Sequence, residues 1–219
     1  MKSINRVVPL ASIILIGLLP LQAMSAAEEK KTAQVEITKG VVSIDAQHNG
    51  KTIKLTRNQD KKNEIDDFYR NTSRGTIQSM HPFKPHQVET IAEREMIDYI
   101  KKASAGDKSI LIVDSRTPSW VEMSGLIPGA INIPYTKFED TDDAVEIMEE
   151  KFGVLVGDTL SFSHSKTLVM YCNGAWCGQS PMAIKKLLSI GYPAANIKYY
   201  RGGMQSWASL GLTVVKEDE

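Results

Sequence analysis

Residues 166–191 constrain the fold of this chain more than any other stretch. An apolar run over residues 168–170 leads to Cys172, a pattern typical of a buried strand. A glycine-containing loop follows, and Ser180 then precedes a proline, which predicts a helix start because serine caps a free N–H and proline has none to lose. Apolar residues at helical spacing continue to Gly191, which is suited to end a helix. The stretch therefore predicts a strand, a loop and a helix.

Cys172 is the candidate nucleophile of this stretch. It would lie at the carboxyl end of the strand, where the N–H groups of the loop and the positive end of the helix dipole meet. Such a position binds anions and lowers the pKa of a thiol, so it favours a reactive cysteine over a merely buried one. The residues expected to present backbone N–H groups around this thiol are Asn173, Gly174, Ala175, Trp176, Gly178, Gln179 and Ser180.

Strand-like and helix-like segments alternate through residues 86–219, the predicted main domain. A capping box that starts at Thr90 predicts one helix, and the apolar run at residues 110–113 predicts a strand buried on both faces. The alternation predicts an α/β fold with a parallel sheet flanked by helices on both faces, and sites beyond the carboxyl ends of its strands. Asp114 and Arg116 at one such end are candidate supporting residues. They could steer a substrate, but pairing with each other is favoured.

Residues 1–27 have the pattern of a secretory signal peptide. Lys2 and Arg6 precede an apolar run over residues 7–24, and small residues then precede a charged segment. The pattern favours cleavage over an uncleaved anchor, so we expect export to a bacterial periplasm, with no membrane span after cleavage. The chain has 26 basic and 26 acidic side chains, and this balanced charge does not indicate a nucleic-acid partner.

Residues 28–85 form a predicted N-terminal extension with a small amount of β-structure. Alternating apolar residues on both sides of Asn49-Gly50 predict a β-hairpin. Residues 58–79 are polar and predicted to be irregular, and the prolines within residues 80–85 predict an extended connector. The extension carries no chemical motif, so we expect it to pack on the main domain or to contact a protein partner.

Three ordered motifs resemble those of rhodanese-like sulfurtransferase domains. They are Asp114-x-Arg116 with residues 126–134, Cys172 with its loop, and residues 200–207 with Gly202, Gly203 and Trp207. The resemblance implies a five-stranded parallel sheet over about residues 88–215. It also implies that Cys172 takes sulfane sulfur from a small donor (thiosulfate, a polysulfide or a persulfide) and passes it from a persulfide to a thiol or cyanide-like acceptor. The loop is similar to that of exported single-domain rhodaneses with two loop cysteines.

The loop departs from the family pattern in length and in charge. Ser180 lies eight positions after Cys172, so the loop is longer than usual, and Gln179 stands where the family has an arginine. No residue of the loop is cationic, which disfavours an anionic donor such as thiosulfate. A cysteine phosphatase is also disfavoured, because it needs an arginine six positions after the nucleophile and that position is Gly178.

Cys177, inside the same loop, leaves several functions open. It could attack a Cys172 persulfide and release sulfide, form a reversible disulfide with Cys172, or remain a free thiol or a loop staple. Reversible pairing would make the chain a thiol–disulfide redox protein. A third hypothesis is a non-enzymatic sulfur-binding module whose extension contacts a partner. No cofactor is expected, and no cysteine–histidine spacing predicts a metal site.

Overall fold

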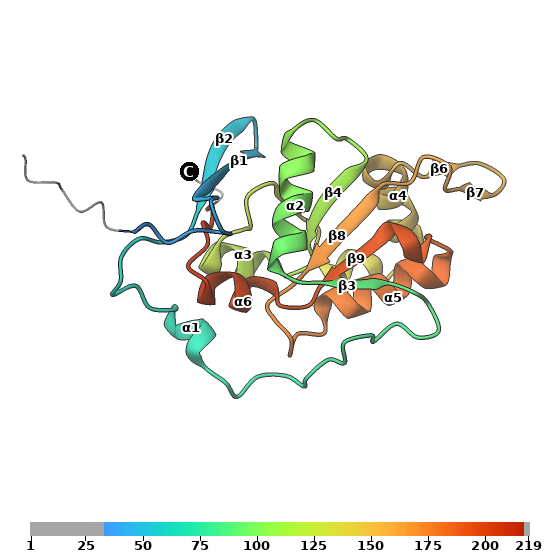
Figure 1. Ribbon diagram of the computed structural model, residues 1–219. Coiled ribbons are helices and arrows are strands. Elements are labelled where there is room, and N and C mark those ends of the chain that lie inside the picture. Colours follow the sequence, from blue (N-terminus) through green and yellow to red (C-terminus); the bar gives the residue numbers. More distant parts are fainter. Residues whose placement is uncertain (1–32, 217–219) are drawn as a thin grey trace, which may run out of the picture. The chain divides into compact units, whose positions relative to one another are not determined.

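The computed structural model describes residues 33–216, of which residues 34–216 belong to one compact unit (Figure 1). The predicted signal peptide lies outside the described residues. The centre of the unit is a parallel five-stranded sheet with the strand order β3-β9-β8-β4-β5, which confirms the predicted α/β fold. Its strands are β3 (Glu89–Ile91), β4 (Ile110–Asp114), β5 (Ala130–Asn132), β8 (Thr167–Tyr171) and β9 (Ile197–Tyr200).

Helices cover both faces of the sheet because its side chains alternate between two hydrophobic cores (Figure 1). Met170 of β8 faces the core under α4 (Thr141–Phe152) and α5 (Gln179–Ile190), whereas Val169 faces the core under α2 (Glu93–Ser104) and α6 (Gly203–Ser209). No helix in the described part of the chain is long and apolar enough to span a membrane. The remaining short elements are α3 (Pro118–Ser124), η1 (Tyr135–Phe138), η2 (Ala194–Asn196), β6 (Leu155–Val156) and β7 (Leu160–Ser161).

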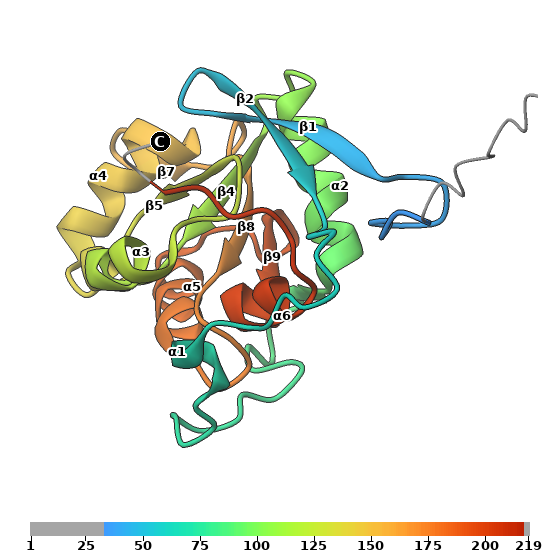
Figure 2. The same cartoon turned by 90° about the vertical axis from the view of Figure 1, so that its left-hand side faces the viewer.

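The predicted hairpin of the N-terminal extension is confirmed. Strands β1 (Ser43–His48) and β2 (Lys51–Thr56) pair in antiparallel register around a two-residue turn. Asn49 and Gly50 have φ values of 47° and 76°, as this tight turn requires. Leu55 is fully buried in the core that also holds α2 and α6, so the hairpin shares a core with the sheet (Figure 2).

The chain between the hairpin and β3 contains one short helix, α1 (Asp67–Arg70), in a segment predicted to be irregular. The predicted extended connector is wrong, since residues 82–85 form a turn that is closed by a hydrogen bond from His86 N to Phe83 O (2.9 Å). The Phe83 ring is buried and packs edge-on against Tyr199, with ring centroids 5.3 Å apart. Burial of this aromatic ring outweighs the extended bias of residues that precede proline.

Two helices begin a little away from their predicted starts. Thr90 belongs to β3, and α2 begins at Glu93, with the Glu95 carboxylate accepting a hydrogen bond from Ala92 N (3.1 Å). Helix α5 begins at Gln179, so Ser180 lies within its first turn and does not cap it. The hydroxyl of Ser180 is therefore available for another role.

Candidate functional site

The candidate site lies where two central strands end. Cys172 directly follows β8, the middle strand of the sheet, and Asp114 is the last residue of the neighbouring β4. The parallel register pairs Asp114 with Tyr171, which places the next residue, Ser115, beside Cys172. The site therefore occupies the carboxyl edge of the sheet, as the sequence predicted for an α/β fold.

The loop after β8 is held by the start of α6. The N–H groups of Met204 and Gln205 donate to the carbonyl oxygens of Cys172 (3.0 Å) and Asn173 (2.8 Å). Gly203 allows this close approach, because a Cβ at its position would lie 2.3 Å from the Cys172 carbonyl oxygen. Within the loop, Cys177 N donates to Gly174 O (2.9 Å), which turns the chain back towards Cys172.

Both loop cysteines are buried, free thiols. The Cys172 Sγ atom donates to the carbonyl oxygen of Cys177 at 3.5 Å. The Cys177 Sγ atom donates to Oε1 of Gln179 at 3.7 Å. Gln179, which replaces the family's arginine, thus orients the second thiol, and the fold brings together the two sulfur atoms that the sequence singled out.

The two thiols differ in pKa, and the pKa of Cys172 is raised, whereas its position at the strand end had led us to expect a lowered one. Burial, followed by the hydrogen bond and charge of Cys177, raises the pKa of Cys172 well above its usual range. The pKa of Cys177 falls to about 7, because its interaction with the Cys172 side chain lowers it and the backbone N–H groups of Gln179 and Asn173 add to this against the effect of burial. The pair therefore loses its first proton around neutral pH, and the charge is favoured on Cys177.

Asp114 and Arg116 pair with each other below the loop. Their Oδ2 and Nη2 atoms lie 2.6 Å apart, and both side chains are fully buried. Arg116 Nη1 also donates to Ser124 Oγ (2.5 Å), and Nη2 donates to Gly125 O (2.6 Å). The guanidinium donors therefore tie the end of β4 to α3 and to the residue that follows it.

A covering segment from the N-terminal extension, residues 69–80, crosses the loop. Gln78 N donates to Ala175 O (2.8 Å), and the Arg201 guanidinium donates to Gln78 O (2.7 Å). The Tyr69 hydroxyl donates to Asn173 Oδ1 (3.2 Å). These contacts join residues about a hundred positions apart, so no local sequence pattern could predict them.

Trp176 supports the loop from its own side. Its Nε1 donates to Gln205 Oε1 (2.8 Å), and its ring lies 6.3 Å from that of Trp120. The guanidinium of Arg74, in the covering segment, lies 5.1 Å from the Trp120 ring centroid and 5.6 Å from that of Trp176. The loop itself contains no cationic side chain. Through this cation–π contact, the Arg74 guanidinium lies against the Trp176 ring of the loop.

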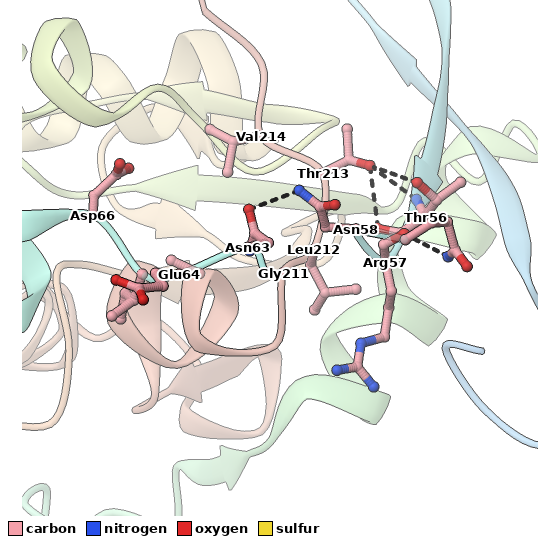
Figure 3. Close-up of a pocket in the computed structure, with 13 residues that line it drawn as sticks. Thr56, Arg57, Asn58, Asn63, Glu64, Asp66, Gly211, Leu212, Thr213 and Val214 are labelled. Atoms are coloured by element: carbon pink, nitrogen blue, oxygen red, sulfur yellow. Dashed lines mark hydrogen bonds between the residues drawn. The ribbon is translucent and has the colours of Figure 1, made fainter. Parts of the chain in front are cut away.

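A separate cavity of about 490 Å³ lies between residues 56–66 and residues 208–214 (Figure 3). Thr56 N donates to Thr213 Oγ1 (2.9 Å) and Asn58 Nδ2 to Asn63 Oδ1 (2.8 Å), so polar groups of its wall are already paired. Neither cysteine lines this cavity. The two loop cysteines therefore lie at the edge of the sheet, outside this cavity.

Comparisons with known proteins agree with the motifs. The model of the rhodanese-like domain family matches residues 96–210. The sulfur carrier protein TtuD of Thermus thermophilus is 32% identical over 97 residues, which cover 44% of this chain and 32% of that protein. An HTH-type transcriptional regulator of Mycobacterium tuberculosis is 30% identical over 117 residues, which cover 53% of this chain and 42% of that protein. The chain thus spans less than half the length of these curated relatives.

A solved structure of a rhodanese-related protein from Thermoplasma volcanium has 26% sequence identity and a TM-score of 0.38, covering 59% of this chain and 99% of that chain. The family match itself includes the strand end at Asp114, the loop after β8 and helix α6, and it spans more than half of the chain. The protein therefore belongs to the rhodanese-like domain family.

Proposed function

We propose that this protein is a sulfurtransferase that carries sulfane sulfur as a persulfide on Cys172. The observation that carries the proposal is the position of Cys172, directly after the central strand and inside a loop that ends at the start of α5. A thiol at such a helix start is placed for nucleophilic attack on sulfur, and the backbone N–H groups of the loop stabilise the sulfur anion that results.

The reaction has two balanced steps. The Cys172 thiolate attacks the outer sulfur of the donor, an S–S bond to Cys172 forms, and the donor's own S–S bond breaks, so that a thiolate or sulfite leaves with the electron pair. An acceptor thiolate or cyanide then attacks the terminal sulfur and releases the Cys172 thiolate. The Cys177 thiolate, which forms first, is the base next to Cys172; taking the Cys172 proton before the first step is uphill because the pKa of Cys172 is the higher of the two, and capture of the donor sulfur by the Cys172 thiolate draws the transfer forward.

The donor that fits this site best is a persulfide or polysulfide. The loop carries no cation, and the guanidinium of Arg74 lies against the outer faces of two tryptophan rings. A dianion such as thiosulfate would find only neutral donors in the loop, whereas a singly charged sulfur chain needs less compensation. A thiol or cyanide-like compound is the matching acceptor. The signal-peptide pattern of residues 1–27 supports a periplasmic setting for this exchange.

A thiol–disulfide redox function is the second candidate. Two adjacent thiols that influence each other's pKa favour it. In a related sequence of steps, the Cys177 thiolate attacks Cys172 of the persulfide, a disulfide forms, and hydrosulfide leaves. A pure partner-binding module has less support, since the hairpin of the extension is part of the core and its covering segment contacts the loop.

The mass of the intact mature protein distinguishes these functions. After treatment with a polysulfide, a gain of about 32 Da that a reductant removes is expected for the sulfurtransferase. Cys172→Ser should abolish the gain, whereas Cys177→Ser should retain it with a longer lifetime. A wild-type protein that loses two hydrogens and gains no sulfur would favour the redox function and exclude the persulfide carrier.

A further inference from the structure

Three buried hydroxyl groups at the carboxyl edge of the sheet have no hydrogen-bond partner within residues 33–216. They belong to Ser115, Ser180 and Tyr199, and all three residues are fully buried. A buried hydroxyl without a partner destabilises a fold, so nearly all such groups are paired. Three of them around one thiol pair point to a ligand that they bind during function.

Ser115 and Cys172 lie side by side and face the same core. Residue Asp114 of β4 pairs with Tyr171 of β8, and Ser115 N donates to Tyr171 O (2.9 Å), which extends the ladder by one position. Side chains alternate along a strand, so Cys172 points to the same side as Met170 two residues earlier. By the same alternation, the hydroxyl of Ser115 lies on this side as well.

Tyr199 and Ser180 approach the thiols from two other elements. Tyr199 pairs with Met170 across β8 and β9 and faces the same core, and Ser180 lies in the first turn of α5, which covers this face. Burial, and then the charges of Cys172 and Cys177, raise the pKa of Tyr199. Ser180 lowers the pKa of Cys172, although its hydroxyl does not complete a hydrogen bond in the resting geometry.

We propose that Tyr199 and Ser115, together with Ser180, form a hydroxyl pocket that donates hydrogen bonds to the terminal sulfur of a persulfide on Cys172. This inference rests on the proposed sulfurtransferase function. Hydroxyl groups donate to a sulfur anion without protonating it, so the terminal sulfur is held in place and its negative charge is partly offset when an acceptor attacks it.

Tyr199→Phe is the informative variant, and Tyr192→Phe is its matched control. Both tyrosines are buried in the same core, but the Tyr192 hydroxyl donates to Lys166 O (2.7 Å) and the Tyr199 hydroxyl donates to no protein group. We expect Tyr199→Phe to keep or raise the wild-type denaturation midpoint, because it removes an unpaired buried hydroxyl, while its persulfide decays roughly 10-fold to 100-fold faster, the loss expected for a hydrogen bond to a charged group. Tyr192→Phe should show the opposite, with a lower midpoint and an unchanged persulfide lifetime.

The proposed hydroxyl pocket would be ruled out if the persulfide lived as long in Tyr199→Phe as in the wild type. A fall in its denaturation midpoint as large as that of Tyr192→Phe would also rule it out, since this would reveal a structural partner for the hydroxyl. Ser115→Ala provides a second variant, for which we expect the same pattern with a smaller change in persulfide lifetime.

The pocket can be tested even if the wild-type protein takes up no sulfur, a result that would exclude the proposed function itself. The same hydroxyl groups should stabilise a Cys172 thiolate. In a Cys177→Ser background, where Cys172 is the remaining cysteine, the pH profile of thiol alkylation should therefore shift upward by roughly one pH unit when Tyr199→Phe is added. The charged groups facing this region, Asp114 and Arg201, are unchanged in both variants. An unshifted profile would exclude the pocket.

Discussion

Single hydrogen bonds decide which loop thiol ionises first. The Cys172 side chain and two backbone N–H groups interact with Cys177 and lower its pKa. At Cys172, burial is the largest effect and raises the pKa. A charge on either sulfur disfavours a charge on the other, so the pair titrates as one unit over the range of neutral pH. In the proposed reaction, Cys172 acts as a nucleophile only after it has lost its own proton.

This difference predicts a pH dependence for the reactivity of the loop. The rate of alkylation in the wild type should rise with pH around a midpoint near 7, where Cys177 ionises. At lower pH the rate should be small, because both thiols are then protonated. In Cys177→Ser, the remaining thiol is the one whose pKa burial raises, so the midpoint should move up by roughly one pH unit or more. Mass spectrometry at a series of pH values measures both. Equal midpoints would assign the lower pKa to Cys172.

At the scale of elements, the turn between β9 and α6 fixes the loop after β8. The first N–H groups of α6 bind the carbonyl oxygens of Cys172 and Asn173. Gly203 has a φ of 56° and leaves no space for a side chain against Cys172. Gly202 and Gly203 thus help to position the loop after β8, although they lie about thirty residues after Cys172 in the sequence.

Gly203→Ala should therefore damage both the loop and the fold. We expect a decrease of about 1–3 kcal/mol in the free energy of unfolding, because the new Cβ must displace backbone, and a slower persulfide formation at Cys172. Denaturant titration and intact mass measure these effects. Gly157→Ala is the control, since a Cβ there meets only the Thr159 carbonyl oxygen at 3.9 Å. If the two variants were equally stable, the Gly203 contact would not constrain the loop.

At the scale of the whole molecule, the N-terminal extension and the sheet share one core. Leu55 of the hairpin is fully buried with residues of α2 and α6, and the covering segment bonds to the loop through Gln78 and Ala175. The described chain should therefore unfold as one cooperative unit.

A truncation of the hairpin core tests this cooperativity. Leu55→Ala should lower the free energy of unfolding by about 2–5 kcal/mol and shift the fluorescence transition of the tryptophans beside the loop by the same amount. Ile77→Ala removes a side chain that is 84% exposed and should change stability by less than about 0.5 kcal/mol. Separate transitions for the hairpin and for the tryptophans would show that the extension unfolds independently.

Local patterns were sufficient for the elements of the fold. The apolar runs before Asp114 and Cys172 predicted the central strands, and Asn49-Gly50 predicted the hairpin, because each depends on residues that are neighbours in sequence. The patterns failed where distant packing outweighed them. Phe83 turned a predicted extended connector into a turn by packing on Tyr199, and Ser180 became part of a helix instead of its cap.

The sequence by itself determined the α/β architecture, the family and the two thiols of the loop, since periodicity and motif spacing are written along the chain. Only the tertiary structure decided what surrounds those thiols. It placed Ser115 beside Cys172, paired Tyr199 with Met170 on the same face of the sheet, and brought Arg74 over Trp176. It also gave Cys177 the lower pKa. These relations depend on the order of parallel strands and on burial, which join residues that no sequence spacing connects.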